Sequence, residues 1–309
     1  MNRNEAIFNE RISNNQYIVA VSKYVHPAEP VVVQFRDGTA KSVLPCGVGD
    51  VTPQGVPPEE PSTIATISLE DSSLTIKRIG MEEVPKNKRN DDLNEARAKG
   101  YILIQIYDDE WEKNWDLIRA RIASKLQMNM RIGARECTVY PIEYIPAFLE
   151  KNNLMGKGSS TSINLGLMCG NILVGVMGFS KARFNKSYTY ELVRFCTLKN
   201  LTVVGGASKL FKYFREHYKG SVISYANRRW CADDALMYGH LGFTYSHSSP
   251  PGYFYYNGSK KLSRYQCQKH KLQVLFPELF THEKTEKEIM KEAGYYRCYD
   301  CGNDVYVIE

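Results

Sequence analysis

The sequence predicts an α/β fold of the α+β kind, with a mixed central sheet and flanking helices in its C-terminal half and a small β-rich domain at its N-terminus. Between residues 190 and 243, apolar strand patterns alternate with helical ones, and Gly205-Gly206 separates a strand from a helix. Before residue 93, short alternating segments are divided by turns rich in Pro and Gly. The 309 residues suffice for one large domain or two to three small ones.

Residues 1–93 form the expected β-rich domain. Strands are predicted over 17–24 and 30–35, with Asp37-Gly38 as a hairpin turn toward Val43, and alternation returns over 64–79. The intervening Pro- and Gly-rich stretch, 46–61, is typical of an exposed loop. Nothing in this segment indicates what it binds.

Residues 94–130 form a strand-helix segment. A buried strand is predicted over 101–107, and Asp108-Asp109 mark a helix start, where carboxylates complement the helix dipole. The helix carries an apolar face made by Trp111, Trp115, Ile118, Ile122 and Leu126.

Residues 131–260 carry the predicted sheet domain. A helix is expected over 141–154, and strands 163–168 and 172–179 are expected to pair through a turn at Gly170-Asn171. Residues 261–309 are expected to pack on this domain as a C-terminal extension, with a helix over 285–293 and a strand near Val305.

Charge is unevenly distributed along the chain. The net charge is +6, but residues 151–309 carry 22 Lys and Arg against 12 Asp and Glu, whereas residues 1–150 carry 18 against 22. A basic half suits a polyanionic partner, either nucleic acid or a phosphate-rich cofactor. Lysine faces that are simply solvated account for the same counts.

Composition places the chain in a reducing compartment. The eight cysteines follow no disulfide framework, and the first fifteen residues lack the apolar core of a signal peptide. No stretch reaches the roughly 18 apolar residues that a membrane span needs. A cytoplasmic protein without a membrane partner is therefore expected.

The glycine turn is the predicted ligand site. Val204, Gly205, Gly206, Ala207 and Ser208 lie between an apolar strand and an amphipathic helix. Backbone N–H groups at such a turn face an anion, and the helix dipole favours negative charge there. The turn therefore predicts a phosphorylated ligand.

The order of elements from about residue 140 to 256 resembles the GNAT acetyltransferase superfamily. That family holds the pyrophosphate of an acyl-coenzyme A on a turn of the type Gln/Arg-x-x-Gly-x-Gly/Ala. The matching positions here are Thr202, Gly205 and Ala207, so the leading basic or amide residue is absent. The resemblance implies acetyl-coenzyme A or a related acyl-coenzyme A as the donor.

A narrower resemblance rests on the run from Glu191 to Cys196, Ser224-Tyr225-Ala226, Tyr238 and Gly242-Phe243. These residues are similar to those of the Mom family of phage DNA-modification proteins. The resemblance implies a GNAT-like domain that modifies adenine in DNA inside the host cytoplasm. Mom-like proteins usually follow Ser-Tyr-Ala with Asp, whereas this chain has Asn227, which removes a charge at that position.

A second resemblance covers residues 94–309. The run from Gly100 to Trp111 looks like the closing strand and helix of very-short-patch-repair-type nuclease domains. Phage homing-endonuclease-like proteins join such a segment to a GNAT-like part, and share the endings 268–272 and 299–303. A nuclease needs acidic metal ligands upstream, and the spacing of Asp37, Lys41 and Glu70-Asp71 does not match that requirement.

Three residues are catalytic candidates. Glu191 is placed to deprotonate an amine, or else forms an ion pair with Arg194 or another cation. Tyr238 is placed to protonate a leaving group, or else is a core aromatic with a satisfied hydroxyl. Ser224 ends a strand beside them, where it either contacts substrate or belongs to the core.

Two further groups of residues have both functional and structural interpretations. Arg228, Arg229 and Trp230 form a candidate nucleic-acid contact that holds phosphate and stacks a base, or else they anchor a loop. The weaker alternative is a zinc site, whose ligands would be Cys267, His270, Cys298 and Cys301. Incidental thiols are favoured over zinc, because these residues are expected in different elements.

The leading hypothesis is a phage-type transferase that moves an acyl or related small group from a coenzyme A-like donor to an amine, with a nucleobase in DNA as the expected acceptor. The alternative is a homing-endonuclease-like DNA-binding protein whose GNAT-like module has no transferase chemistry. A binding protein that has lost both activities is a third hypothesis. The sequence indicates neither the acceptor atom nor the oligomeric state.

Overall fold

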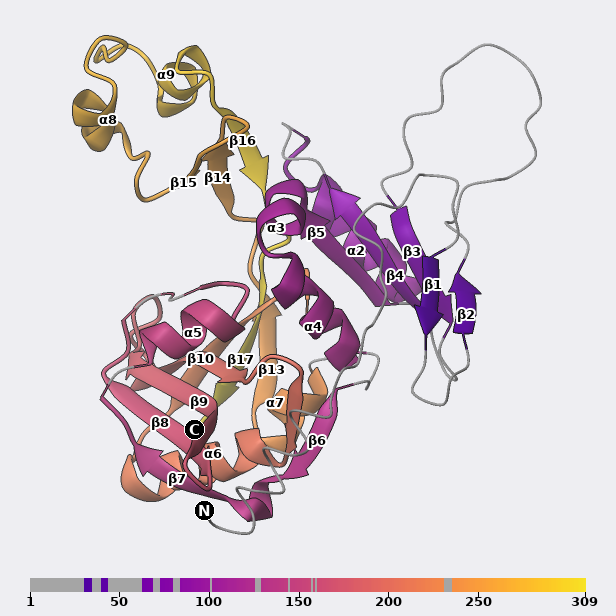
Figure 1. Ribbon diagram of the computed structural model, residues 1–309. Coiled ribbons are helices and arrows are strands. Elements are labelled where there is room, and N and C mark those ends of the chain that lie inside the picture. The colour runs from indigo at the N-terminus through magenta and orange to yellow at the C-terminus, as the bar shows by residue number, and fades with distance from the viewer. Residues whose placement is uncertain are drawn as a thin grey trace.

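The computed structural model describes residues 31–34, 40–43, 63–68, 73–79, 84–100, 102–125, 129–143, 145–156, 158, 160–230 and 235–309, with side-chain surroundings given from residue 76 onward (Figure 1). The strands predicted over 17–24, the loop predicted over 46–61 and the helical position Leu126 lie outside these residues. None of the helices within the described ranges has both the length and the apolar character to cross a membrane.

A seven-stranded mixed sheet forms the centre of the larger domain (Figure 1). Its order is β13-β17-β12-β10-β9-β8-β7, and only the β10–β12 pair is parallel. The fold class predicted from the sequence is thereby confirmed: a GNAT-like α+β domain with a mixed sheet and flanking helices. The strands are β7 Cys137–Pro141, β8 Ile163–Cys169, β9 Ile172–Lys181, β10 Tyr190–Thr197, β12 Val222–Asn227, β13 Thr244–Ser248 and β17 Asn303–Ile308.

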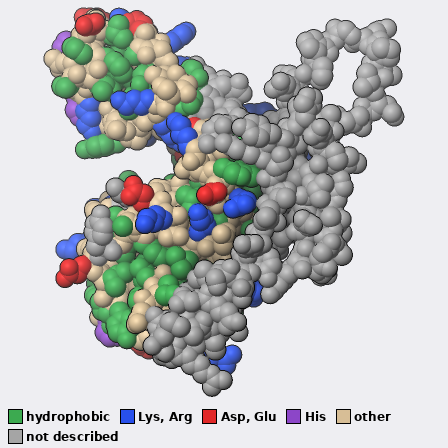
Figure 2. All heavy atoms as spheres, viewed as in Figure 1, with side chains coloured by type: hydrophobic (Ala, Val, Ile, Leu, Met, Phe, Trp, Pro, Cys, Tyr) green, Lys and Arg blue, Asp and Glu red, His purple; other side chains and the backbone are tan. Residues whose placement is uncertain are grey.

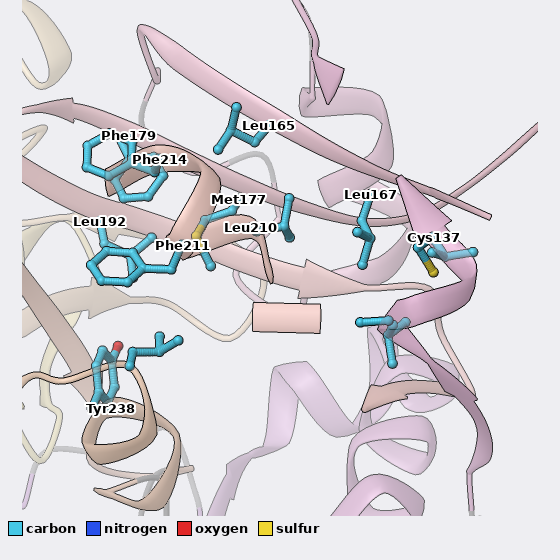
Figure 3. Close-up of a cluster of buried hydrophobic side chains, with 14 of the residues drawn as sticks. Cys137, Leu165, Leu167, Met177, Phe179, Leu192, Leu210, Phe211, Phe214 and Tyr238 are labelled. Atoms are coloured by element: carbon cyan, nitrogen blue, oxygen red, sulfur yellow. The ribbon is translucent and has the colours of Figure 1, made fainter. Parts of the chain in front are cut away.

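Helix α6, Gly206–His217, covers one face of the sheet together with α7, Ala235–His240. Leu210, Phe211 and Phe214 share one helical face because they are spaced by one and four residues, and they are at most 4% exposed. Phe214 stacks on Phe179 of β9 with ring centroids 3.7 Å apart. Figure 3 shows these aromatic rings packed together within the main core.

The opposite face of the sheet carries α5, Pro146–Asn152. Ile145 and Leu149 pack there against Val176 of β9 and Cys196 of β10. The helix predicted over 141–154 is thus confirmed in a shorter form, since it begins at Pro146, where proline is favoured in the first turn.

The predicted hairpin of β8 and β9 is confirmed. The two strands pair antiparallel from Ile163↔Phe179 to Cys169↔Ile172. Gly170 at the turn has a φ of 57°, a left-handed conformation that glycine adopts without steric cost.

The last strand corrects the predicted domain boundary. Residues 261–309 were expected to form an extension, but β17 lies between β12 and β13 and completes the sheet. The intervening residues 253–299 therefore form an insertion between β13 and β17, which we call the inserted lobe (Figure 1). It contains β14 Tyr253–Tyr256, β15 Lys261–Ser263, α8 Lys269–Leu275, α9 Glu286–Glu292 and β16 Tyr296–Tyr299.

A second, smaller unit precedes the sheet domain and is called the N-terminal module. Its β4 pairs antiparallel with β3 and parallel with β5, so the sheet joins strands from both sides of the boundary predicted at residue 93. A separate antiparallel β1–β2 pair matches the two strands predicted on either side of Asp37-Gly38, while the turn itself lies outside the described residues. The elements are β1 Val31–Gln34, β2 Ala40–Val43, β3 Thr63–Ser68, β4 Ser73–Ile79, α2 Lys88–Ala98, β5 Ile102–Tyr107, α3 Asp108–Lys113 and α4 Trp115–Lys125.

The helix predicted after Asp108-Asp109 is divided at Asn114 into α3 and α4. The division leaves Trp111 and Trp115 in tilted contact, 4.5 Å between ring centroids. After α4, strand β6, Met130–Gly133, pairs parallel with β11, Leu201–Val204, and a short 3-10 turn, Ala134–Glu136, leads into β7. This pair brings the start of the sheet domain beside the residues that precede α6.

Candidate functional site

The two parallel strands of the main sheet stay paired over only three residues. Pairing runs from Tyr190↔Val222 to Leu192↔Ser224 and stops there. In β10 a bulge follows at once, because its register against β9 shifts between Leu192 and Arg194. Beyond this point β10 and β12 no longer pair, although both strands lie in the middle of the sheet.

Ser224 and Tyr238 meet on the α7 side of this separation. The Ser224 Oγ lies 3.0 Å from the Tyr238 hydroxyl and donates to the Leu192 carbonyl at 3.1 Å. Both side chains are buried, and the Tyr238 ring stacks on Tyr306 of β17 at 4.3 Å. The structure thus brings two of the predicted catalytic residues together, in a hydrogen-bonded and aromatic setting that also fits a core role.

The glycine turn begins α6 in the predicted way. Gly205 is the N-cap residue with a φ of 77°, and no side chain caps the helix. Helical geometry leaves the first amides of a helix, here those of Gly206, Ala207 and Ser208, without acceptors inside the helix. The turn is open to solvent, with Val204 47% exposed. An anion can approach the exposed positions of this turn, Val204, Gly205 and Ser208, whereas Gly206 is buried.

Positive charge surrounds that turn. Lys209 of α6 donates through Nζ to the carbonyls of Ala134 and Cys137, which fixes α6 against the turn between β6 and β7. Arg131 and Arg135, from β6 and that turn, are both exposed. Because β6 pairs with β11, Arg131 lies opposite Thr202, the position where the related turns carry Gln or Arg.

Glu191 lies on the other face of the sheet from Tyr238. Its neighbours Tyr190 and Leu192 belong to the core under α6, and side chains alternate along a strand. The carboxylate is 3% exposed and accepts from the Arg183 guanidinium through both oxygens, at 3.1 Å from Nε to Oε2. The ion-pair interpretation of Glu191 is thus observed, with Arg183 rather than Arg194 as the partner.

Arg194 and Tyr225 complete this second face. Burial, reinforced by the charge of Arg183, lowers the pKa of Arg194, while Glu191 raises it. Burial raises the pKa of Tyr225, and the Glu191 carboxylate adds to the effect. Arg194 and Tyr225 therefore both lie within the electrostatic influence of the Arg183–Glu191 pair.

Arg228 has a structural role instead of the predicted nucleic-acid contact. It is 5% exposed, and its guanidinium donates to the side-chain oxygens of Asn90 and Asn94 in α2. Its Nε lies 3.0 Å from Asp304 Oδ1. The side chain therefore joins the sheet domain to the N-terminal module and does not reach a phosphate in this conformation.

Arg229 and Trp230 correct the prediction in the same way. Arg229 is 3% exposed and makes two bonds to the Glu110 carboxylate, at 2.7 and 2.8 Å, while its guanidinium lies 4.0 Å from the centre of the Tyr107 ring. Trp230 is 3% exposed in a cluster with Ile118 and other residues of the module. Loop anchoring, the alternative interpretation, is what the structure supports.

The candidate zinc ligands are dispersed. Cys267, Cys298 and Cys301 are buried in three different hydrophobic clusters, and His270 is exposed on α8. Among the residues whose positions are described, no three His, Cys, Asp or Glu side chains are grouped as metal ligands. The Cys301 thiol instead contacts the Gln105 side-chain oxygen at 3.1 Å.

Strands β3 and β4, upstream of the segment that resembles a nuclease, hold no carboxylate. β3 reads TIATIS and β4 reads SLTIKRI, without Asp or Glu in either. These two strands therefore do not supply acidic metal ligands. Asp37 and Glu70-Asp71 lie outside the described residues.

Sequence reasoning missed Arg183 and Phe184. Both follow β9 in the loop that leads to β10, where no hydrophobic period marks a residue as functional. The signal in the sequence was an arginine followed by an aromatic residue, eight and seven residues before Glu191, and only the fold shows their contacts.

The fold and these two half-sites define a GNAT-like domain with an anion-accessible turn on one side of the parted strands and a carboxylate-arginine group on the other. Neither a protein-family model nor a curated protein matches the sequence. Among solved structures, the C-terminal DUF2156 domain of a putative lysylphosphatidylglycerol synthetase from Agrobacterium fabrum is similar with a TM-score of 0.20 and 9% identity, over 91% of this chain and 84% of that chain. A likeness this distant does not bear on activity.

Proposed function

We propose that the chain is a transferase that moves an acyl or related small group from a coenzyme A-like donor to an amine, with a nucleobase in DNA as the acceptor. Two observations in the same domain carry the proposal: β10 and β12 part after three paired residues, and α6 starts without a side-chain cap. An extended thioester arm can lie where two parallel strands part, while its phosphates meet helix amides.

The residues near α6 fit the phosphates of such a donor. The amides of Gly206, Ala207 and Ser208 supply donors to which no side chain makes a capping hydrogen bond, and Val204 and Gly205 beside them are exposed. Lys209, Arg131 and Arg135 add positive charge around the turn. Thr202 stands where the GNAT turn carries Gln or Arg. The positive charge of these three residues compensates for the absence of that side chain.

In the proposed reaction, one proton is transferred on each face of the main sheet. The amine nitrogen forms a bond to the acyl carbon as the carbon-sulfur bond breaks, and Glu191 takes the amine proton. Tyr238, bonded to Ser224, gives its proton to the departing thiolate. The two groups lie on opposite faces, so they act together only across the gap between β10 and β12.

DNA as the acceptor is supported by charge and by the Mom resemblance. Residues 151–309 carry the excess of Lys and Arg. Figure 2 shows Lys and Arg side chains on both sides of the hollow between the inserted lobe and the sheet domain. Such a surface attracts a polyanion. The proposed setting is the cytoplasm of a phage host.

Two measurements test the proposal. A saturating donor raises apparent stability, by about 2.7 kcal/mol at a hundredfold excess over Kd, so acetyl-coenzyme A and coenzyme A are compared by thermal shift. Mass spectrometry of DNA incubated with protein and acetyl-coenzyme A then detects an added group on a base. Absence of both the shift and the mass change rejects a coenzyme A transferase.

The alternative function is a homing-endonuclease-like DNA-binding protein with a GNAT-like module that does no chemistry. The β3-β4-β5 sheet followed by α3 favours it, because the segment predicted from the nuclease resemblance does form a strand and a helix. DNA affinity that is unaffected by coenzyme A, with no change in DNA mass, distinguishes this function from the transferase.

A further inference from the structure

We infer that the Glu191 face holds an unpaired deoxynucleotide, with its base stacked on Phe184 and its phosphate on Arg183 and Arg194. The inference deepens the proposed function, on which it rests for the reaction at Glu191. It assigns the acceptor site to residues that lie on the face away from α6.

Phe184 is an aromatic platform held in place at the surface. Its side chain is 78% exposed, although its ring is fixed by an edge contact with Tyr225, 5.9 Å between centroids, and by the Arg183 guanidinium at 5.6 Å. A nucleobase offers a flat π face that stacks on such a ring regardless of sequence.

Two arginines lie near Glu191. Among the described residues, the Glu191 carboxylate pairs with Arg183, and both charges act on Arg194. The Arg194 Nη1 donates at 2.7 Å to the carbonyl of its neighbour Val193, and its buried Nε has no hydrogen-bond partner among the residues with described positions. A half-buried guanidinium with unused donors suits a phosphate group.

Arg183 connects phosphate binding to Glu191, the proposed general base. Its side chain is 34% exposed, so a phosphate can reach the guanidinium that now binds Glu191. A phosphate oxygen that accepts from Arg183 shares those donors and leaves the carboxylate with a lone pair for the amine. Nucleotide binding on this face would therefore release Glu191 for proton transfer.

The ligand is an unpaired nucleotide because a base must have a free face before it can stack on Phe184. In a duplex both faces of every base are already stacked, and a base must leave the helix to stack on protein. Single-stranded DNA, or a duplex with a mismatched base, is therefore expected to bind more tightly than a matched duplex of the same length.

Binding of a short fluorescent single-stranded oligodeoxynucleotide to the full chain, measured by anisotropy without any donor, tests the site. Phe184→Ala is expected to weaken binding about tenfold at every salt concentration. Arg194→Gln is expected to weaken binding and to lower the slope of log affinity against log salt by about 0.7, the value for one lost phosphate contact on a single strand.

Matched variants control for general effects. Tyr140→Ala removes another exposed aromatic, 53% exposed on the edge strand β7, and Lys212→Gln removes an exposed charge from α6. Both are expected to bind the oligonucleotide as the wild type does. Phe184 is exposed, so its variant is expected to keep the wild-type melting temperature.

Wild-type affinity in Phe184→Ala overturns the inference, as does an unchanged salt slope in Arg194→Gln or a preference for matched duplex. Because no donor is present, the result is independent of coenzyme A binding. Binding that depends on Phe184 in a protein without donor affinity would reject the transferase and keep the nucleotide site.

Discussion

At the scale of single residues, a second buried pair of a carboxylate and an arginine lies away from the candidate site. The Glu110 carboxylate is bound by Arg229 in a two-pronged ion pair and also accepts from the Tyr107 amide at 3.3 Å. Both partners are buried. Removing one member of a buried pair leaves the other charge without compensation, which costs more than the pair itself contributes.

Glu110→Ala is therefore expected to lower the free energy of unfolding by about 3–5 kcal/mol, measured by urea denaturation. Glu216→Ala is the matched control, because Glu216 pairs with Lys212 on the surface of α6, with the two side chains 55% and 79% exposed. The control is expected to keep the wild-type midpoint. Equal midpoints for the two variants would contradict the role assigned to the buried pair.

The same carboxylate gives a pH dependence with a definite sign. Burial alone raises the pKa of Glu110, but the charge and hydrogen bonds of Arg229 outweigh it, so the pKa is lowered overall. A lowered folded-state pKa stabilises the fold above the unfolded pKa of about 4.3, and that contribution is lost as pH falls through the folded value. The stability difference between wild type and Glu110→Gln should thus stay constant near neutral pH and shrink on acidification below about pH 4. A difference that grows on acidification would refute the assignment.

At the scale of elements, the turn before α6 depends on one glycine. Gly205 has a φ of 77°, and an added Cβ would meet Ala134 at 3.7 Å, an ordinary contact. The cost of Gly205→Ala is therefore conformational and amounts to about 1–2 kcal/mol. Gly239→Ala in α7, where nothing lies within 4 Å of an added Cβ, is the control and is expected to be neutral or stabilising.

The proposed donor site gives a second prediction for Gly205. If the amides of Gly206 and Ala207 hold the donor phosphates, a strained Gly205→Ala turn should also reduce the thermal shift caused by coenzyme A, while Gly239→Ala should leave the shift intact. A full shift in Gly205→Ala would place the donor elsewhere. The thermal shift caused by coenzyme A, measured with each variant, shows whether the donor binds at the α6 turn or elsewhere.

Elements with a local signal were predictable from the sequence. The β8–β9 hairpin carries its turn at Gly170, and α9 begins where Thr285 caps it through the Glu288 amide, close to the predicted helix. β17 was misplaced because its pairing with β12 and β13 joins residues far apart in the chain, and no local pattern encodes that. The structural role of Arg229 was not predictable for the same reason, because its partner Glu110 lies 119 residues away in the sequence.

At the scale of the whole molecule, the N-terminal module and the sheet domain share a buried polar interface. Arg97 of α2 and Arg228 both bind Asp304 of β17, each at 3.0 Å, and Asp304 is 4% exposed. Arg229 reaches Glu110 in the same interface. Because β12 ends and β17 begins there, the interface holds strands that border the candidate site, and its loosening should be detectable at a distance from the variant.

The reactivity of the Cys301 thiol can be used as a probe of that interface. Its thiol is buried against Gln105 and the Arg89 carbonyl, and burial raises its pKa to about 12. A protected thiol with so little thiolate reacts only when the interface opens. Cys196 is the internal reference, because burial also raises its pKa to about 12 while it packs under α5 in the sheet domain.

Glu110→Ala removes the partner of Arg229 and is expected to increase the alkylation rate of Cys301 by iodoacetamide at least tenfold, as read by peptide mass spectrometry under native conditions. The rate at Cys196 should change far less, because α5 and β10 do not depend on Glu110. Parallel acceleration of both thiols would mean that the module and the sheet domain open as one cooperative unit. Acceleration confined to Cys301 would show that the interface opens locally, so that the N-terminal module can move while the sheet around β10 and β12 stays folded.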